Sequence, residues 1–287
     1  MINSDINNSL HLRAVEAIDS GNIRELRKIL EDHPEIVRER FDSPEEGYFK
    51  NPYLLWFIAD NPIRHPGLPE NIVEITTLII KYAKKEAPDS FQYQLDYTLE
   101  LVATGSIPRK CGVQIELIDL LIESGATAGD LLGTVAHGNV EAAEHLLKKG
   151  GQLNLAVAIC INRQDAIPGL LENANKEDKQ LALMASAFYG KPDMLSLLLK
   201  NGADASGYIQ SSSRFHSHAT PLHQAVSSGS LNAVKVLIDA GARLDLKDKI
   251  YEGTPEEWAR YMRTETENEE TRNKYREIEN YLQSLAS

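Results

Sequence analysis

Hydrophobic residues recur at helical spacing in short segments along most of the chain, and glycine or proline separates the segments. Apolar side chains three and four residues apart lie on one face of a helix, so each segment predicts an amphipathic helix. Such short helices bury their apolar faces only by packing together, so the pattern predicts an all-α protein of stacked helix pairs. The expected helices include residues 11–19, 23–30, 53–59, 70–84, 93–103, 114–123 and 231–239.

The most regular stretch is residues 219–253. Thr220-Pro221 predicts a helix start, because proline at the first helical position has its φ preset and its missing N–H would have had no partner there. A short helix follows and Gly229 ends it. Residues 231–239 then form a second helix, which Gly241 closes.

These residues carry a known pattern of Thr-Pro-Leu-His-x-Ala, then Gly, then Val-x-x-Leu-hydrophobic-x-x-Gly-Ala. The stretch resembles an ankyrin repeat. The resemblance implies an all-α, ankyrin-repeat helical solenoid with variable fingers and capping helices, acting as a non-catalytic scaffold that binds another protein. It also implies a structural role for His223, which would form hydrogen bonds near the helix start. The matching residues are Thr220, Pro221, Leu222, His223, Ala225, Gly229, Val234, Leu237, Ile238, Gly241 and Ala242.

Five similar helix endings measure the length of each repeat. They begin at Leu121, Leu146, Leu170, Leu198 and Leu237, so successive starts differ by 25, 24, 28 and 39 residues, against about 33 in a regular ankyrin repeat. The two shortest periods leave room for two helices and predict repeats without a β-hairpin finger. The longest period predicts a long finger over 205–219, and loops longer than packing requires often carry binding residues.

We expect residues 1–287 to form a single solenoid of seven or eight helix pairs. Its expected parts are a polar leader at 1–9, divergent N-terminal repeats at 10–112, clearer ankyrin repeats at 113–253 and a C-terminal cap at 254–287. In the N-terminal half, residues 41–52 and the proline-rich 61–69 predict irregular loops where a regular repeat has tight turns. In the cap, residues 264–270 predict a solvated connection before a last helix.

Composition narrows the functional class. The formal net charge of -12 disfavours nonspecific binding to nucleic acid or anionic membranes. No apolar run approaches the roughly 20 residues that span a bilayer, so we expect no membrane segment. Cys111 and Cys160 lie within or beside apolar runs, which favours packing over chemistry. Without a dense cysteine framework, reduced thiols and a cytoplasmic protein are expected.

The surface of the fingers and first helices is the expected binding site, because aromatic residues with adaptable polar neighbours make interface anchors. Gln224 and its neighbours are expected to be exposed there, and the finger aromatics either contact a partner or pack finger against finger. The partner is expected to be another protein. The predicted partner-binding residues are Tyr208, Phe215, His216, His218, Gln224, Ser227, Ser228, Lys249 and Tyr251.

Three histidines near the long finger suggest an alternative. His216, His218 and His223 lie within eight residues, and with Asp245 or Asp248 they could hold a metal or small ligand and support an enzymatic activity. Phosphate-binding glycine loops, nucleophile elbows and His-Glu-x-x-His sites are absent from the sequence, so we expect no enzyme, metal or cofactor. A purely structural spacer is the third possibility.

Overall fold

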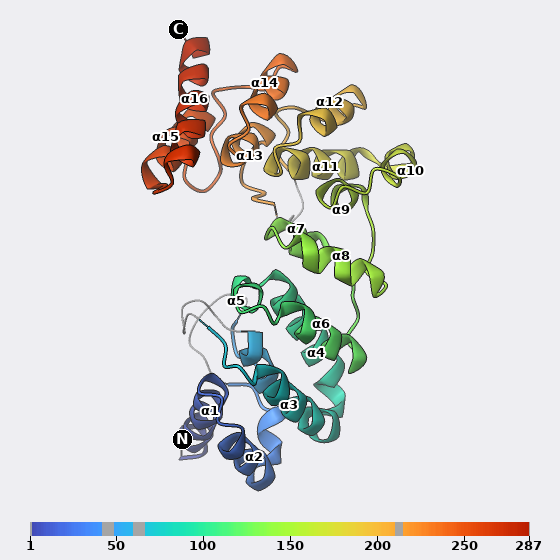
Figure 1. Cartoon of the computed structure of the whole chain (residues 1–287), viewed down its shortest axis with the longest axis vertical. Coiled ribbons are helices and arrows are strands. Elements are labelled where there is room, and N and C mark those ends of the chain that lie inside the picture. Colours follow the sequence, from blue (N-terminus) through green and yellow to red (C-terminus); the bar gives the residue numbers. More distant parts are fainter. Residues whose placement is uncertain (1, 42–48, 60–66, 210–214, 287) are drawn as a thin grey trace. The chain divides into compact units, whose positions relative to one another are not determined.

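The structure is a computed structural model that describes residues 2–41, 49–59, 67–209 and 215–286 (Figure 1). The chain folds into two compact units, here called the N-terminal unit (Met1–Gln152) and the C-terminal unit (Leu153–Ser287). Both are all-α. Within the described residues, β pairing is limited to two isolated bridges, Arg40 with Tyr53 and Asp130 with Gln152.

The N-terminal unit is built from four helix pairs, α1/α2, η2/α3, α4/α6 and α7/α8. The first members contact one another in the order α1, η2, α4, α7, and the second members in the order α2, α3, α6, α8. This is the stacking of a helical solenoid. The elements are α1 (Ile2–Asp19), α2 (Ile23–Asp32), η1 (Pro34–Val37), η2 (Leu54–Ala59), α3 (Ile72–Glu86), α4 (Pro88–Thr104), α5 (Ser106–Lys110), α6 (Gln114–Glu123), α7 (Leu132–Ala136) and α8 (Val140–Lys148), where η marks a 3₁₀ helix.

The C-terminal unit repeats this arrangement with four further pairs. Its first helices contact one another in the order α9, α11, α13, α15. Among its second helices, α14 contacts both α12 and α16. The described chain therefore holds eight pairs, as predicted. Whether the two units form one continuous solenoid stays a prediction. The elements are α9 (Leu155–Cys160), α10 (Ile167–Asn173), α11 (Lys176–Phe188), α12 (Pro192–Lys200), α13 (Pro221–Ser227), α14 (Leu231–Asp239), α15 (Pro255–Glu265) and α16 (Glu269–Ala286).

Four of the five helix endings share one backbone geometry. A glycine with positive φ follows each of α6, α8, α12 and α14, at Gly125, Gly150, Gly202 and Gly241. The N–H of the next residue then bonds a carbonyl five residues earlier, as in Ala242 N–H to Leu237 O at 2.9 Å. This closes the last turn as a Schellman motif. The fifth ending has Ala174 instead, in an extended conformation, so α10 ends without this motif.

The connections follow the predicted repeat lengths. In the two shortest repeats, residues 124–131 join α6 to α7 and residues 149–154 join α8 to α9, and neither connection contains a β-strand. The connection from α12 to α13 runs from 201 to 220 and is described at 201–209 and 215–220. The expected loop at 41–52 lies mostly outside the described residues, as does most of the proline-rich segment 61–69.

Several helix boundaries differ from expectation. The predicted polar leader at 1–9 is helical from Ile2 and forms the first part of α1. Residues 54–59 form a 3₁₀ helix rather than an α-helix, and the stretch between α4 and α6 contains the unpredicted helix α5. The connection between α15 and α16 covers only 266–268.

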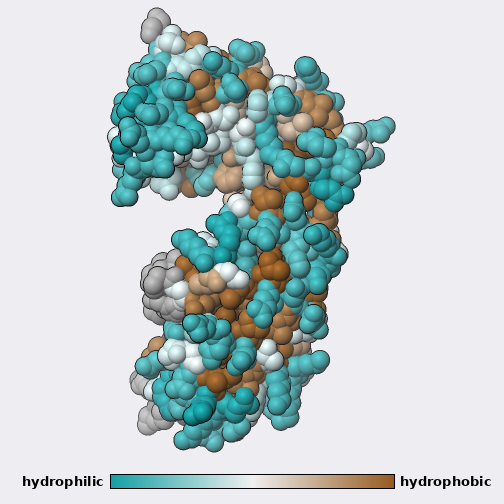
Figure 2. Space-filling view, in the orientation of Figure 1, coloured by the Kyte–Doolittle hydropathy of each residue, from teal (hydrophilic) through white to brown (hydrophobic). Residues whose placement is uncertain are grey.

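The closing pair α15/α16 fits the role of a cap. Ala259, Ile278 and Leu282 are buried, while Tyr261 and Leu285 are exposed by 63% and 44%. In the face shown in Figure 2, hydrophilic residues gather over α15 and α16. A polar outer face is what the last repeat of a solenoid needs.

Candidate functional site

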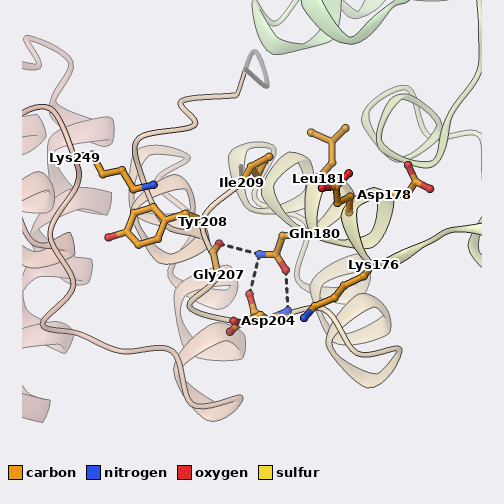
Figure 3. A pocket seen from close by; sticks show the side chains of 10 residues that line it. Lys176, Asp178, Gln180, Leu181, Asp204, Gly207, Tyr208, Ile209 and Lys249 are labelled. Carbon is orange, nitrogen blue, oxygen red and sulfur yellow. Dashed lines mark hydrogen bonds between the residues drawn. The ribbon is translucent and has the colours of Figure 1, made fainter. Parts of the chain in front are cut away.

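A groove with a volume of about 660 Å³ lies in the C-terminal unit, between the start of α11 and two connections (Figure 3). We call residues 201–209 and 215–220 the long finger, and residues 240–254, which join α14 to α15, the short finger. This finger groove has the size typical of a ligand-binding pocket. Its lining residues are Lys176, Glu177, Asp178, Gln180, Leu181, Asp204, Gly207, Tyr208, Ile209 and Lys249.

Gln180 of α11 fixes the base of the long finger. Its Nε2 donates to the carbonyl oxygens of Asp204 and Gly207 at 3.0 and 2.9 Å. Its Oε1 accepts from Asp204 N–H at 2.8 Å. The start of α11 is itself held by a capping box between Asn175 and Asp178. The finger is thereby attached to a well-defined helix start.

Gly207 permits this close approach. A Cβ at this position would lie 3.0 Å from Asp204 Cβ and 3.0 Å from Gln180 Nε2, which is too close for an ordinary contact. Next to it, Ser206 joins the two fingers, because its Oγ accepts from Arg243 N–H at 2.9 Å. The geometry of the groove therefore depends on glycine at 207.

Tyr208 links the two fingers a second time. Its hydroxyl donates to Lys247 O at 2.6 Å, and the Lys249 ammonium lies 4.2 Å from the centre of its ring. Burial raises the pKa of Tyr208, and the Asp248 charge adds to this. The phenol therefore stays protonated at neutral pH and remains a hydrogen-bond donor.

Asp248 organises the short finger from inside. Its Oδ1 accepts from the N–H groups of Ile250 and Tyr251 at 2.9 and 2.7 Å. Its Oδ2 accepts from Gly253 N–H and Trp258 Nε1, both at 3.0 Å. Burial by itself would raise the pKa of this carboxyl, but the four hydrogen bonds outweigh it and lower the pKa to about 2.

These bonds shape a projecting tip. Ile250 and Tyr251 are 61% and 75% exposed, which is unusual for large apolar side chains. Glu252 follows with φ of 55°, a left-handed conformation that is uncommon outside glycine. Asp248 therefore holds a tight loop that presents two large side chains to solvent.

His223 joins the start of α13 to the same finger. Its Nδ1 accepts from the Thr220 N–H at 3.3 Å and from the Thr220 hydroxyl at 2.7 Å. A backbone N–H can only donate, so Nε2 carries the proton and donates to Gly253 O at 2.9 Å. Burial lowers the pKa of His223. The predicted structural role of this histidine is confirmed.

The histidine cluster does not assemble a metal site. The described residues contain no group of three or more His, Cys, Asp or Glu side chains that could hold a metal. His223 already forms hydrogen bonds through both ring nitrogens, and Asp248 does so through both carboxylate oxygens. Asp245 forms an ion pair with Arg243 at 2.6 Å. His216 and His218 stack with aromatic rings instead, each within 6.5 Å of the Trp258 ring.

Two predicted contact residues lie inside the protein. Phe215 and Gln224 are both 0% exposed, so the expected exposure of Gln224 is wrong. Phe215 packs on Phe188 with ring centres 5.5 Å apart, and Gln224 Nε2 donates to His216 O at 3.3 Å. They support the base of the long finger and present no side-chain surface to a partner.

The other predicted residues divide by exposure. His216, Lys249 and Tyr251 are exposed, while Tyr208 and His218 are half-buried. Ser227 and Ser228 are half-buried as well, and the Ser228 hydroxyl donates to Ala225 O at 2.7 Å. The surface available around the fingers is therefore smaller than the sequence suggests.

Sequence reasoning missed most of the groove lining. Gln180, Leu181 and the start of α11 lie more than twenty residues before the finger that they contact. One sequence signal could have placed Asp204 in the groove. Asp204 directly follows Gly202-Ala203, and this pair marks the end of one repeat and the start of the long finger.

The two cysteines have different surroundings. Cys160 is buried, and burial raises the pKa of its thiol to about 12, so it stays protonated at neutral pH. Packing is therefore confirmed for Cys160. Cys111 is exposed and its Sγ accepts from Leu68 N–H at 3.4 Å, so the expectation of a packed side chain is wrong there.

Comparison with known proteins identifies the repeat. Residues 131–248 match a family model described as Ankyrin repeats (3 copies), which covers helices α7 to α14. The chain is 25% identical over 210 residues to human transient receptor potential cation channel subfamily A member 1, covering 61% of this chain and 19% of the channel. The chain thus spans about a fifth of that relative.

Among solved structures, the human ASB11 ankyrin repeat domain is similar at 16% identity. The match covers 69% of this chain and 92% of that domain, with a TM-score of 0.33. In the described part of the chain, none of the helices is both long and apolar enough to cross a membrane.

Proposed function

We propose that this chain, whose residues 131–248 are ankyrin repeats, is a non-catalytic scaffold that binds another protein through the two fingers of its C-terminal unit. Ankyrin repeats are generally protein–protein interaction modules and are typically not enzymes. The proposed surface consists of the finger groove and the tip of the short finger. We place this function in the cytoplasm on the cysteine content alone.

The main support is the exposed pair Ile250–Tyr251 on a loop whose backbone donates three hydrogen bonds to Asp248. A side chain that is already ordered loses less conformational entropy on binding, so a preorganised tip gains affinity. Tyrosine is enriched among residues that dominate binding energy, and its hydroxyl adds a polar contact. Asp248 holds the loop from inside, so it would influence binding without touching the partner.

Partner capture tests the proposal. Ile250→Ser/Tyr251→Ser removes the tip while leaving Asp248 and its bonds in place. We expect this variant to keep its thermal unfolding midpoint and lose at least one partner that the unaltered chain recovers from lysate, measured by quantitative mass spectrometry. A photo-crosslinking amino acid at 251 should attach to the same partner.

The matched control alters exposed apolar residues away from the fingers. Tyr261→Ser/Leu285→Ser changes two such residues on the closing helices. It should recover the same partners as the unaltered chain. Equal recovery by the tip variant and the unaltered chain would contradict a binding role for the short finger.

A further inference from the structure

Three aromatic rings of the N-terminal unit surround the side chain of Arg40. The rings of Tyr53, Trp56 and Tyr93 lie 5.4, 5.7 and 6.4 Å apart, measured between the centres of each pair. The Arg40 guanidinium carbon lies over them at 4.8, 5.8 and 5.9 Å from their centres. Each distance is within the range of a cation–π interaction. We call these four residues the Arg40 cup.

Backbone pairing sets the position of Arg40. Arg40 and Tyr53 form an antiparallel bridge, and the next residue, Phe41, donates its N–H to Pro52 O at 2.9 Å. Arg40 is nevertheless exposed, and Tyr93 beside it is 49% exposed. A cation and an aromatic ring therefore reach solvent side by side on an ordered part of the chain.

The Arg40 guanidinium has unused hydrogen-bonding capacity. It carries five N–H donors. Hydrogen bonding to the hydroxyl of Tyr53, with a smaller contribution from Tyr93, raises the pKa of Arg40. No carboxylate among the described residues forms an ion pair with it, whereas the exposed Arg13 pairs with Glu25 at 2.6 Å. Arg40 is thus an exposed charge that still lacks a carboxylate partner in the described part of the chain.

The anion that suits this site best is a protein carboxylate. The described residues 38–41 carry two arginines and one glutamate, so the local charge is positive. Nucleic-acid binding depends on several cations that each neutralise a phosphate, and the cup supplies one. The formal net charge of -12 also repels a polyanion.

We propose that the Arg40 cup is a second protein-binding surface, which binds a partner segment that carries Asp or Glu beside an aromatic or aliphatic residue. The planar guanidinium forms paired hydrogen bonds with the carboxylate, and the Tyr93 ring contacts the apolar neighbour. Arginine and tyrosine are enriched among residues that dominate binding energy. The rings already order the guanidinium, so binding costs less conformational entropy. This surface is independent of the two fingers.

Parallel selections from a random 12-residue peptide display library, on the unaltered chain and on Arg40→Ala, test this chemistry without knowledge of the partner. Peptides found only with the unaltered chain should be enriched in Asp or Glu next to an aromatic or aliphatic residue. Fluorescence anisotropy then measures binding of the most enriched peptide.

Two further variants separate the charge from the shape of the cup. Arg40→Lys keeps the charge and loses the planar fork, so it should bind the peptide about fivefold more weakly. Tyr93→Ala removes the exposed ring and should weaken binding about tenfold. The affinity should also fall as salt rises. Both variants should keep the thermal unfolding midpoint of the unaltered chain, because both side chains are exposed.

Arg27→Ala is the matched control, because Arg27 is an exposed arginine on α2 of the same unit and lies over none of the described rings. It should bind the peptide like the unaltered chain. Indistinguishable peptide pools from the unaltered chain and Arg40→Ala, or equal loss in Arg27→Ala, would overturn the inference. So would displacement of the peptide by a single-stranded RNA 12-mer.

The chain's own acidic residues supply a second control. Glu45 and Glu46 follow Arg40 closely in sequence and lie outside the described residues. Glu45→Gln/Glu46→Gln should bind the peptide at least as tightly as the unaltered chain, and weaker binding would contradict the inference. The tip variant Ile250→Ser/Tyr251→Ser should bind this peptide normally, so failure here is distinguishable from failure of the proposed function.

Discussion

The two units connect neighbouring helix pairs by different means. In the C-terminal unit, a few motif residues form hydrogen bonds from one pair to the next, as His223 does from α13 to Gly253 O. Both units also use aromatic rings and amide side chains, but in the N-terminal unit these contacts act without such a motif. Both solutions stack helices, but only the first requires a fixed sequence pattern.

The aromatic cluster of the N-terminal unit is centred on Trp56, which is 2% exposed. Its ring lies 5.4 Å from Tyr53, 5.7 Å from Tyr93 and 4.3 Å from Tyr97, measured between ring centres. The Arg40 guanidinium lies over the Tyr53 ring at 4.8 Å. Such packing joins η2 to α4 without requiring a particular turn, so irregular loops are tolerated.

Amide side chains satisfy the backbone between pairs. Within the pair α4/α6, Gln114 Nε2 donates to the carbonyl oxygens of Val102 and Ala103 at 2.9 and 3.2 Å. Asn139 Nδ2 donates to Ala103 O at 2.8 Å, and Gln94 Nε2 donates to Val37 O at 3.0 Å. These bonds give buried backbone carbonyl groups of the N-terminal unit a hydrogen-bond partner.

Replacement of Trp56 should give the largest effect. Trp56→Ala removes the centre of the aromatic cluster and should lower the unfolding free energy of the N-terminal unit by about 4 kcal/mol. The chain has two tryptophans, so Trp258 alone then reports on the C-terminal unit. Urea unfolding followed by circular dichroism should show an early transition, while Trp258 fluorescence changes at the urea concentration seen before.

A common shift of both signals would show that the units unfold together. In that case the different connections would not divide the chain into independently stable parts.

Replacement of Asp248 should give the largest effect in the C-terminal unit. Asp248→Ala removes the acceptor of four part-buried hydrogen bonds, which should cost about 3 kcal/mol. Urea unfolding monitored by Trp258 fluorescence in a Trp56→Phe background measures the loss. Asp245→Ala is the control, because this carboxylate forms an exposed ion pair, and it should leave the transition unchanged.

The contrast also explains what the sequence predicts well. Helices and their pairing follow from apolar spacing and from glycine endings such as Gly241, because both depend on local backbone geometry. The stacking of η2 on α4 is harder to predict, since it depends on aromatic packing of Trp56 on Tyr93 and Tyr97, which lie far away in the chain. The helix α5 was missed because Pro108 lies within a turn rich in helix breakers.

The candidate site was predictable only in part. The exposed residues Lys249 and Tyr251 follow from the repeat register, since they lie in the finger after Gly241. The burial of Phe215 and Gln224 does not, because it depends on how the long finger folds back on α11 and α13. The role of Gln180 is likewise set by tertiary contact and leaves no local pattern.

His223 should make the C-terminal unit sensitive to mild acid. Its pKa is lowered in the folded state, so its contribution to stability is complete above the ordinary histidine pKa of about 6.5 and is lost as pH falls below that value. His223→Gln should cost about 1–2 kcal/mol at pH 7.5 and less at pH 5. Urea unfolding at both pH values, read by Trp258 fluorescence in the Trp56→Phe background, gives the difference. A loss independent of pH would indicate that His223 is not held neutral.

The smallest predicted effect concerns the glycine helix endings, which both units share. Gly125 and Gly241 end α6 and α14 with φ of 112° and 86°, and a Cβ at either position would meet nothing within 4 Å. Alanine at either position therefore adds backbone strain but no clash, and each variant should lose about 1 kcal/mol. Hydrogen exchange measured by mass spectrometry should localise the loss to the unit that carries the substitution. Unequal losses would mean that the helix endings, and not only the connections between pairs, differ in energy between the units.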